Sequence, residues 1–534
     1  MKVVIIGGGA AGASCAARLR RLDENAEIVI LEKTQDVSIA NCGLPYYVAD
    51  IIADRGQILV SSPQKFKSWF NIEVKLSAEV VSINKSAKNV VLQNGEIIGY
   101  DKLVLTTGAA PIVPPFEGME NQAVFVVRNL DDADKIKNYI AEKKVKKAVV
   151  IGGGFIGVEM AENLRELDID TALVELGTQI LAPIDAEIAA VAQNEMREKG
   201  VKLILADGVN KFENNKIVLK SGAKLEFDAV IMAIGVRSEI KLAKDAGLEV
   251  NRGILVNEYM QTSDGNIYAA GDNVEVEDFV SGENTLVPLA GPANRQGRII
   301  ADNICGYNSV YKKTLGSMVL KVFGLTVSAV GNNEKQLKQK NIPYLKTLIY
   351  GKSNAGYYPD VCPILYKLLF NAEGKILGAQ GVGQKGVEKR IDVISSIMRN
   401  KGTLQELIDS ELCYAPPYAA AKDAVNVLGM SADNIIKGLV KPAFFEDLQN
   451  AVLIDVRPKQ VFAAETINGA INLPISEIRE RFAEIDRDKK IILFCNTGYT
   501  SYNVARILMQ KGYDNVYSLM GGIEMYKEQI KNRS

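Results

Sequence analysis

The chain has 534 residues, enough for several domains, because one hydrophobic core stops growing at roughly 250–300 residues. Its 63 Lys and Arg balance 64 Asp and Glu, so its charge does not favour nucleic acid or a membrane surface as a partner. The sequence lacks histidine, which excludes Cys–His and Ser–His catalysis, and its six cysteines lack the CxxC spacing of zinc sites, so no metal is expected. Because it shows neither a signal-peptide pattern nor a run of about 18 apolar residues, we expect a cytoplasmic protein without a membrane partner.

The first residues match the strand, glycine turn and helix of a dinucleotide site. The apolar run 2–6 enters a turn in which Gly7, Gly9 and Gly12 fit the GxGxxG pattern, and a helical periodicity follows. A second apolar strand then ends at Glu32. In this pattern the helix N-terminus faces the pyrophosphate, and the acidic residue accepts hydrogen bonds from a ribose.

The same pattern occurs a second time. The apolar run 147–151 enters a turn with Gly152, Gly154 and Gly157, and the following strand ends at Glu175. Two fingerprints predict two bound dinucleotides. Because the Glu175 carboxylate would repel a 2′-phosphate and no arginine follows it, NADH is favoured, although some use of NADPH stays open.

Two further strand ends complete a recognisable set. The segment 100–111 closes on Thr107–Gly108, and the segment 262–273 ends in Gly271–Asp272. Together with the fingerprints, these segments resemble the flavoprotein pyridine nucleotide-disulfide reductases. The resemblance implies that the first fingerprint and the Gly-Asp turn bind FAD, while the second fingerprint binds NAD(P)H.

A single cysteine, Cys42, lies in the stretch SIANCGLPYY, and the next cysteine is Cys305. Ser38 and Asn41 offer this thiol polar contacts, which opposes the alternative of a small buried hydrophobic residue. The stretch resembles the single-cysteine branch of the family, and most of all its CoA-disulfide reductases. That resemblance implies that Cys42 lies against the flavin, accepts electrons through it and attacks a sulfur of an incoming disulfide or persulfide.

Ser14, Arg18 and Arg21 form one stripe of the first helix. In the resembling reductases this stripe faces the nucleotide of coenzyme A, whose phosphates need cationic contacts. The alternative is a solvated basic face. Arg20 points away from the stripe and is expected to serve solubility only.

Two tyrosine clusters stand in turn-rich segments, 355–360 and 413–423. The family carries its acid and substrate-contacting tyrosines there, on a domain that forms a homodimer. The resemblance therefore implies that Tyr358 and Tyr418 donate a proton to the leaving thiolate, with Tyr357 and Tyr414 as the next candidates. Aromatic packing at a dimer interface is the alternative.

After residue 448 a new α/β pattern begins. An apolar strand runs into Cys495, the chain curls to Ser501, and a helix follows. This segment resembles a single rhodanese domain, which implies that Cys495 carries sulfane sulfur above a helix N-terminus. The chain departs from the rhodanese pattern at Val461-Phe462 and at Glu465-Thr466-Ile467, which puts the stability of the domain in question more than the chemistry of Cys495.

These resemblances imply an α/β fold class: two Rossmann-like dinucleotide-binding domains of the glutathione-reductase type, an α+β dimerisation domain and a C-terminal α/β rhodanese domain. The expected ranges are 1–111 plus 234–315 for the FAD domain, 112–233 for the NAD(P)H domain, 316–437 for the dimerisation domain, 438–448 for a linker and 449–534 for the rhodanese domain.

The resemblance implies a homodimeric flavoprotein reductase. Its cofactors are FAD and NADH, and coenzyme A is its substrate moiety or bound ligand. It would use NAD(P)H to reduce CoA disulfide, CoA persulfide or polysulfide through Cys42, while Cys495 carries or delivers sulfane sulfur. Two alternatives stay open: a sulfurtransferase or sulfur carrier, and an NADH oxidase with an appended interaction module.

Overall fold

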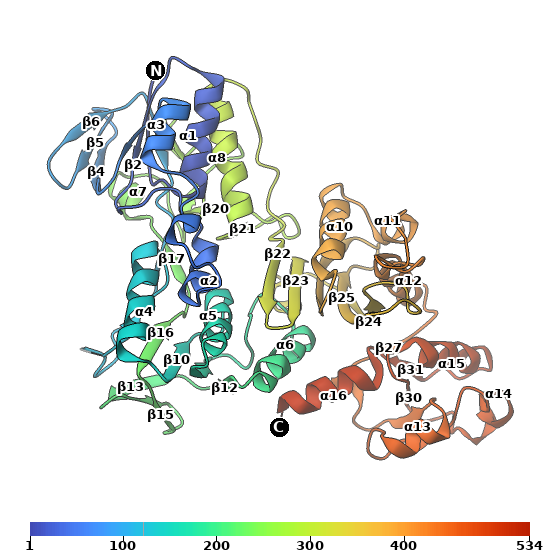
Figure 1. Ribbon diagram of the computed structural model, residues 1–534. Coiled ribbons are helices and arrows are strands. Elements are labelled where there is room, and N and C mark those ends of the chain that lie inside the picture. The colour runs from blue at the N-terminus through green and yellow to red at the C-terminus, as the bar shows by residue number, and fades with distance from the viewer. Residues whose placement is uncertain (121, 534) are drawn as a thin grey trace. The chain divides into compact units, whose positions relative to one another are not determined.

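The computed structural model describes residues 1–120 and 122–533, and the chain divides into two compact units (Figure 1). The first unit holds residues 1–180 and 200–316, and the second holds residues 181–199 and those from 317 onward. None of the helices in the described part of the chain has the length and apolar character that crossing a membrane requires.

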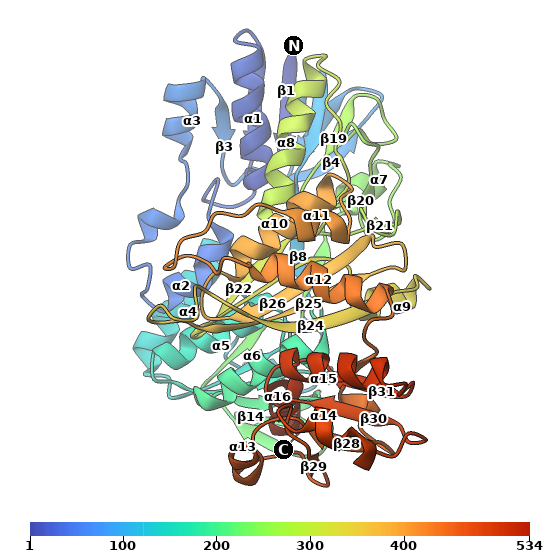
Figure 2. The same cartoon turned by 90° about the vertical axis from the view of Figure 1, so that its right-hand side faces the viewer.

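The first sheet of unit 1 has five parallel strands in the order β19-β7-β1-β2-β3. Its strands are β1 (Lys2–Ile6), β2 (Glu27–Leu31), β3 (Glu73–Lys75), β7 (Lys102–Leu105) and β19 (Ile267–Ala269). Strands β1 and β2 are continuous apolar runs because helices and loops bury both faces of a parallel sheet. Helix α1 (Ala10–Leu22) packs beside α8 (Ala290–Ile304), as both views show (Figures 1 and 2).

The second sheet of unit 1 repeats this architecture in the order β12-β11-β10-β16-β9. Its strands are β9 (Val124–Phe125), β10 (Lys147–Ile151), β11 (Asp170–Val174), β12 (Lys202–Ile204) and β16 (Ala229–Met232). The helices of this part are α4 (Leu130–Lys143) and α5 (Phe155–Glu166). The two parallel sheets agree with the two predicted dinucleotide folds.

Short strands and helices complete unit 1. Its smaller sheets contain β4 (Val80–Asn84), β5 (Asn89–Leu92) and β6 (Ile97–Gly99); β13 (Val209–Glu213), β14 (Lys216–Leu219) and β15 (Lys224–Glu226); β8 (Ala109–Pro111) and β17 (Val236–Ser238); and β18 (Ile254–Leu255), β20 (Val274–Glu277) and β21 (Asn284–Thr285). Its shorter helices are α2 (Leu44–Val48), α3 (Pro63–Phe70) and α7 (Lys241–Asp245).

Unit 2 contains an antiparallel sheet with the order β22-β23-β26-β25-β24. Its strands are β22 (Met318–Val322), β23 (Leu325–Gly331), β24 (Leu345–Lys352), β25 (Pro363–Phe370) and β26 (Ile376–Gly383). The accompanying helices are α6 (Ala186–Glu198), α9 (Glu334–Gln339), α10 (Val387–Arg399), α11 (Leu404–Asp409) and α12 (Ala424–Ile436).

The C-terminal part of unit 2 is a parallel sheet with the order β27-β31-β30-β28-β29. Its strands are β27 (Pro442–Ala443), β28 (Val452–Asp455), β29 (Ile471–Asn472), β30 (Ile491–Phe494) and β31 (Val516–Leu519). Its helices are α13 (Lys459–Ala464), α14 (Ile478–Arg481), α15 (Tyr499–Gln510) and α16 (Gly522–Arg533).

Two segments differ from the expected ranges. The expected linker 438–448 contains β27, which pairs with β31, so this segment joins the C-terminal sheet instead of only leading to it. Helix α6 falls inside the expected NAD(P)H range but belongs to unit 2, because it packs against α16 and β26. At the α16 contact, Asn194 Nδ2 donates to the Glu528 carbonyl at 2.9 Å.

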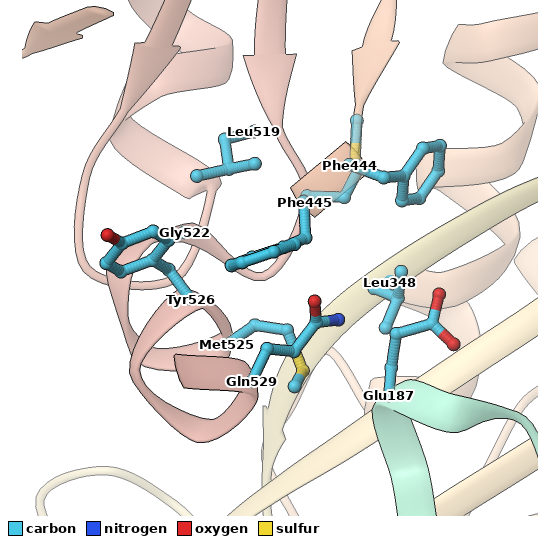
Figure 3. Close-up of a pocket in the computed structure, with 10 residues that line it drawn as sticks. Glu187, Leu348, Phe444, Phe445, Leu519, Gly522, Met525, Tyr526 and Gln529 are labelled. Atoms are coloured by element: carbon cyan, nitrogen blue, oxygen red, sulfur yellow. The ribbon is translucent and has the colours of Figure 1, made fainter. Parts of the chain in front are cut away.

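A small pocket in unit 2 lies where the C-terminal domain meets the antiparallel sheet (Figure 3). Phe444 and Phe445 line it from the start of the C-terminal domain, and Leu348 lines it from β24. The Phe445 ring stacks on Tyr526 of α16 at 5.6 Å between centroids. Aromatic side chains therefore take part in the contact between these two parts of unit 2.

Beside this pocket lies a buried charge network. Lys367 of β25 has no exposed side-chain area, and its Nζ lies 3.1 Å from Asp185, 2.7 Å from Glu187 and in contact with Glu334. Burial alone would raise the pKa of Glu334, but the Lys367 cation outweighs burial, and the pKa falls to about 2. Lys346 adds a second cation, 3.5 Å from Glu187 and 3.1 Å from Glu334, so two lysines neutralise the carboxylates of this network.

Replacing Lys367 with Met should remove the cation that these three carboxylates share, while Lys346 remains beside Glu187 and Glu334. We expect the free energy of unfolding of unit 2 to fall by about 3–5 kcal/mol, the usual cost of removing one partner from a buried ion pair. Urea unfolding followed by circular dichroism measures this loss. Lys338→Met removes an exposed partner of Glu334, 3.5 Å away, and should cost less than about 1 kcal/mol. Equal losses for the two variants would contradict the buried network.

Candidate functional site

Both glycine turns bring backbone into such close contact that a side chain cannot fit. Gly7 has a φ of +99°, and a Cβ at Gly12 would collide with the Gly7 carbonyl. A Cβ at Gly9, by contrast, meets nothing within 4 Å, and no side chain caps the N-terminus of α1. The free amides at this helix end therefore face open space, which fits a pyrophosphate.

The second turn repeats these features. Gly152 has a φ of +108°, a Cβ at Gly157 would collide with the Gly152 carbonyl, and a Cβ at Gly154 meets nothing within 4 Å. The N-terminus of α5 also lacks a side-chain cap. The structure thus contains two uncapped helix ends of the kind that hold a dinucleotide phosphate.

Each turn has a carboxylate beside it. Glu32 Oε2 accepts from Gly8 N at 2.8 Å, and its Oε1 accepts from Thr34 N at 3.0 Å. Glu175 Oε2 accepts from Gly153 N at 2.6 Å, and its Oε1 accepts from the amide of Gly177 at 2.6 Å. Both carboxylates are therefore fixed at the tips of β2 and β11, where a ribose would lie.

The Thr-Gly and Gly-Asp turns meet in the structure. Asn273 Nδ2 donates to Thr107 Oγ1 at 3.0 Å, and Gly271 N donates to Gln296 at 2.8 Å. Arg128 links this corner to α4, with its Nη2 at 3.3 Å from Asp272 Oδ2. Gly108 is needed here because its φ is +68° and a Cβ would lie 2.8 Å from the Arg128 guanidinium. Sequence reasoning missed Arg128, Asn273 and Gln296, whose single polar side chains carry no spacing signal.

Cys42 is exposed and lies in a short 3₁₀ turn, Asn41–Gly43, that leads into α2. Packing around the sulfur raises the pKa of this thiol, and the charges of Glu159 and Asp272 raise it further. Glu159 belongs to α5 at the second glycine turn, and Asp272 belongs to the Gly-Asp turn. The thiol therefore lies within electrostatic range of both predicted nucleotide sites.

The two polar residues expected near Cys42 hold the surrounding loop. Asn41 Nδ2 donates to the Arg128 carbonyl at 2.8 Å. Ser38 has a φ of +55°, and its amide donates to the Gly8 carbonyl at 2.9 Å. The hydrogen bond of the Ser38 amide thus ties the Cys42 loop to the first glycine turn and holds Ser38 at its positive φ.

A carboxylate that sequence reasoning missed lies beside the thiol. Tyr46 OH donates to Glu159 Oε1 at 3.4 Å. Burial raises the pKa of Glu159 to about 7, the neighbouring Glu162 raises it as well, and the Tyr46 hydrogen bond opposes them. An acidic residue only two positions after Gly157, in an otherwise apolar helix start, was the available signal.

The stripe on α1 that was predicted to contact coenzyme A, formed by Ser14, Arg18 and Arg21, is partly engaged with α8. Ser14 Oγ donates to Asn294, and Arg18 Nε lies 2.7 Å from Asp302. Arg21 is exposed, and its guanidinium carbon lies 6.0 Å from the Phe70 ring centroid. Of the three predicted residues, only Arg21 is free of such a partner among the described residues.

The prediction for Arg20 was wrong. This side chain is buried and donates five hydrogen bonds to backbone carbonyls, including Phe70 at 2.7 Å and Asn71 at 3.1 Å. These hydrogen bonds therefore hold the end of α3 against α1. A buried guanidinium is stable there because its donors are all satisfied.

The two tyrosine segments lie together in unit 2. Ala355 N donates to the Pro416 carbonyl at 3.1 Å, and the hydroxyls of Tyr357 and Tyr414 are 2.8 Å apart. Tyr358 is 41% exposed and Tyr418 is 72% exposed, so both phenols remain accessible. The structure thus brings the four candidate tyrosines into one surface region.

Cys495 lies between β30 and α15 and is buried. Its Sγ accepts from Gly498 N at 3.2 Å, and its thiol lies 3.8 Å from Ser501 Oγ. Arg457 Nη1 donates to Asn496 at 3.2 Å, which places a cation beside the sulfur loop. A backbone amide at the sulfur and a guanidinium in the same loop suit an anionic persulfide.

The two departures from the rhodanese pattern affect this network differently. Asp455 and Arg457 form a buried ion pair at 2.6 Å. Thr466 Oγ1 donates to Asp455 at 3.0 Å, and the Glu465 carbonyl accepts from Arg457 at 2.6 Å. Thr466 and Glu465 thus satisfy the buried pair, whereas Val461 is exposed and adds nothing to it.

Glu159→Gln removes the charge beside Cys42 and keeps the shape of the side chain. Below about pH 7, where Glu159 is protonated, Cys42 should react with iodoacetamide at similar rates in the variant and the wild type. Above pH 7 the ionised carboxylate disfavours the thiolate, so the variant should react faster. Mass spectrometry of the Cys42 peptide measures the rate.

The exposed Glu166→Gln on the same helix is the matched control and should follow the wild type. If the pH profile of Glu159→Gln also followed the wild type, Glu159 would have no influence on the thiol.

Comparisons with known proteins agree with this geometry. The pyridine nucleotide-disulphide oxidoreductase model matches residues 1–297, its dimerisation domain matches 318–425, and the rhodanese-like domain matches 443–529. The NADH oxidase of Methanocaldococcus jannaschii is 36% identical over 82% of this chain and 99% of its own length. The coenzyme A disulfide reductase of Staphylococcus aureus is 34% identical over 81% and 99%.

Two solved structures match nearly the whole chain. Reduced Bacillus anthracis CoADR-RHD has a TM-score of 0.97 and 46% identity, covering 100% of this chain and 98% of that one. The NAD-dependent persulfide reductase from A. fulgidus has a TM-score of 0.94 and 36% identity, covering 98% and 100%. The predicted fold class is confirmed: the chain belongs to the pyridine nucleotide-disulphide oxidoreductase family and carries a C-terminal rhodanese-like domain.

Proposed function

We propose that this chain is an NADH-dependent flavoprotein reductase that cleaves the sulfur–sulfur bond of CoA disulfide or CoA persulfide through Cys42. The observation that carries the proposal is the position of this thiol within range of Glu159 at the second glycine turn and Asp272 at the Gly-Asp turn. The likeness to proteins named coenzyme A disulfide reductase and persulfide reductase supports the choice of substrate.

The thiol chemistry is a disulfide exchange. The Cys42 thiolate attacks one sulfur of CoA disulfide, forms a mixed disulfide with CoA and releases the other CoA as a thiolate. A bound FAD supplies the route by which two electrons from NADH reach the mixed disulfide. Reduction of that bond regenerates Cys42 and releases the second CoA thiol. With CoA persulfide, the same steps yield CoA and hydrogen sulfide.

The other site residues take supporting roles in this proposal. FAD binds at the first turn and at the corner beside it, through Gly7, Gly9, Gly12, Glu32, Thr107, Gly108, Gly271 and Asp272. The pyridine nucleotide binds at the second turn, through Gly152, Gly154, Gly157 and Glu175. Ser38 and Asn41 position the Cys42 loop. In a homodimer, exposed Tyr358 and Tyr418 would donate a proton to the leaving CoA thiolate at the partner's thiol.

Cys495 would carry sulfane sulfur as a persulfide. Its buried sulfur, the Gly498 amide and the Arg457 guanidinium together suit that anion. The rhodanese domain begins in this proposal at β27, so the linker is shortened to residues 438–441. A second candidate function, NADH oxidase, is favoured by the name of the Methanocaldococcus relative. A sulfurtransferase as the main role requires that Cys42 be dispensable.

Cys42→Ser should abolish NADH oxidation that depends on CoA disulfide or CoA persulfide, because no second thiol of the chain lies in the same turn. Cys495→Ser should keep CoA-disulfide turnover within about twofold. A steady-state NADH assay with CoA disulfide, CoA persulfide, polysulfide and oxygen at matched concentrations measures both variants. Loss of turnover in Cys495→Ser with retention in Cys42→Ser would favour the sulfurtransferase, and full turnover on oxygen alone would favour the oxidase.

Glu175→Gln should weaken the preference for NADH. The carboxylate stands where a 2′-phosphate of NADPH would come, and the amide keeps the shape of the side chain without its charge. We expect the ratio of kcat/KM for NADH to that for NADPH to fall about tenfold, which corresponds to roughly 1.4 kcal/mol. An unchanged ratio would show that Glu175 does not select the nucleotide.

A further inference from the structure

A cleft of about 310 Å³ opens in unit 1 where the second parallel sheet meets the small sheet that contains β14 and β15 (Figure 1). Its charged lining residues are the first residues of three adjacent parallel strands and residues of the facing strands: Lys147, Asp170, Lys202, Lys216, Lys224 and Glu226. A cavity of this volume can hold a small molecule.

The cleft lies at the opposite edge of the sheet from the second glycine turn. Lys147 begins β10, and Gly152 follows the last residue of that strand. The five residues between these two points span roughly 16 Å. Dinucleotides bind beyond the carboxyl ends of the strands in such a sheet, whereas the amino ends of the strands line this cleft. The proposed nucleotide site therefore does not account for it.

The lining combines buried apolar residues with an excess of positive charge. Ala148, Ala172 and Leu225 are buried and lie among the charged residues of the cleft. Four lysines line the cleft, against two carboxylates. A concave surface with low-dielectric walls and charges mainly of one sign concentrates the electric field, which raises the local concentration of ions of the opposite sign.

The carboxylates of this region are shared between lysines. Glu226 lies opposite Lys216 in the β14–β15 register, and its carboxylate is 3.1 Å from the Lys216 ammonium and 2.8 Å from the Lys147 ammonium. The hydrogen bonds from Lys147 and Lys216 lower the pKa of Glu226 to about 2, so this carboxylate is ionised at neutral pH. One negative charge therefore serves two positive charges on this wall.

The remaining two lysines of the cleft are neutralised still less. Lys224 is 3.0 Å from Glu213, whose carboxylate is also 2.6 Å from Lys211. Lys202 is exposed and forms no ion pair within the part of the chain that the structure describes. Lysines from both walls of the cleft can thus contact an anion that enters between them.

We propose that this cleft binds a condensed inorganic phosphate, an anion of the pyrophosphate and tripolyphosphate class. Such an anion carries several charges on adjacent phosphates, so Lys202, Lys216 and Lys224 can contact it together, each as a compact point charge. None of the described residues that line the cleft is aromatic, so the base of a nucleotide would find no ring to stack on. The inference does not depend on the proposed function.

Isothermal titration calorimetry of the FAD-loaded enzyme with tripolyphosphate tests the site. Saturating NAD⁺ occupies the second glycine turn, and sodium chloride keeps the ionic strength constant, because screening weakens contacts between exposed charges. We expect one tripolyphosphate at the cleft of each chain. Sulfate and thiosulfate, which carry only two charges, should bind at least about tenfold more weakly.

Two variants of the lining should change the affinity in opposite directions. The double variant Lys202→Met and Lys216→Met keeps the length of both side chains without their charges and should weaken tripolyphosphate binding about tenfold. Glu226→Gln removes the carboxylate that competes with the ligand for two lysines, so binding should tighten about fivefold. Lys135→Met, which changes an exposed lysine of α4 outside the lining, is the matched control and should bind like the wild type.

A fold defect cannot explain tighter binding, so Glu226→Gln separates loss of structure from loss of the site. Equal affinities for the wild type, the double variant and the control would place any bound phosphate elsewhere in the chain and overturn the proposal. Weaker binding by Glu226→Gln, equally tight binding of sulfate or thiosulfate, or the absence of saturable binding would overturn it as well.

Discussion

The structure of unit 1 depends on the close approach of backbone at two glycine turns. At Gly12 and Gly157, any side chain would collide with the carbonyl of the glycine that begins the turn. This contact lets each helix start directly against its parallel strand, so that its free amides face a ligand instead of a side chain. The position of Cys42 follows from the first of these turns, because the Ser38 amide is bonded to the Gly8 carbonyl and Cys42 comes four residues later.

The electrostatics around Cys42 oppose its ionisation. Glu159 and Asp272 both raise the pKa of the thiol, and Arg128, which pairs with Asp272, brings a positive charge to this corner. Both carboxylates therefore disfavour the thiolate, which is the form that attacks a disulfide. Cys495 stands in different surroundings: the Gly498 amide donates to its sulfur, and the Arg457 guanidinium, which is paired with Asp455, donates to Asn496 in its loop. The two sulfur sites of one chain therefore differ in the charge that their neighbours present.

Much of the fold could be predicted from the sequence because glycine spacing and apolar runs report local backbone geometry. The fingerprints at Gly7 and Gly152 are local patterns of this kind, and both correspond to a strand, turn and helix. Arg20 could not be interpreted correctly, since some of its acceptors, Phe70 and Asn71, lie about fifty residues away. The same reason applies to Arg18 and Asp302, and to α6, whose Glu187 pairs with the distant Lys367. Long-range pairing of charged side chains leaves no periodic signal in the sequence.

The central claim is that one thiol of this chain, Cys42, exchanges bonds directly with a CoA disulfide. Intact-mass spectrometry of the reduced enzyme after incubation with CoA disulfide, without NADH, tests it most directly. The account predicts one covalently bound CoA per chain, located at Cys42 by peptide mapping and removed when NADH is added. A CoA located at another cysteine, or one at Cys42 that NADH does not release, would contradict the account.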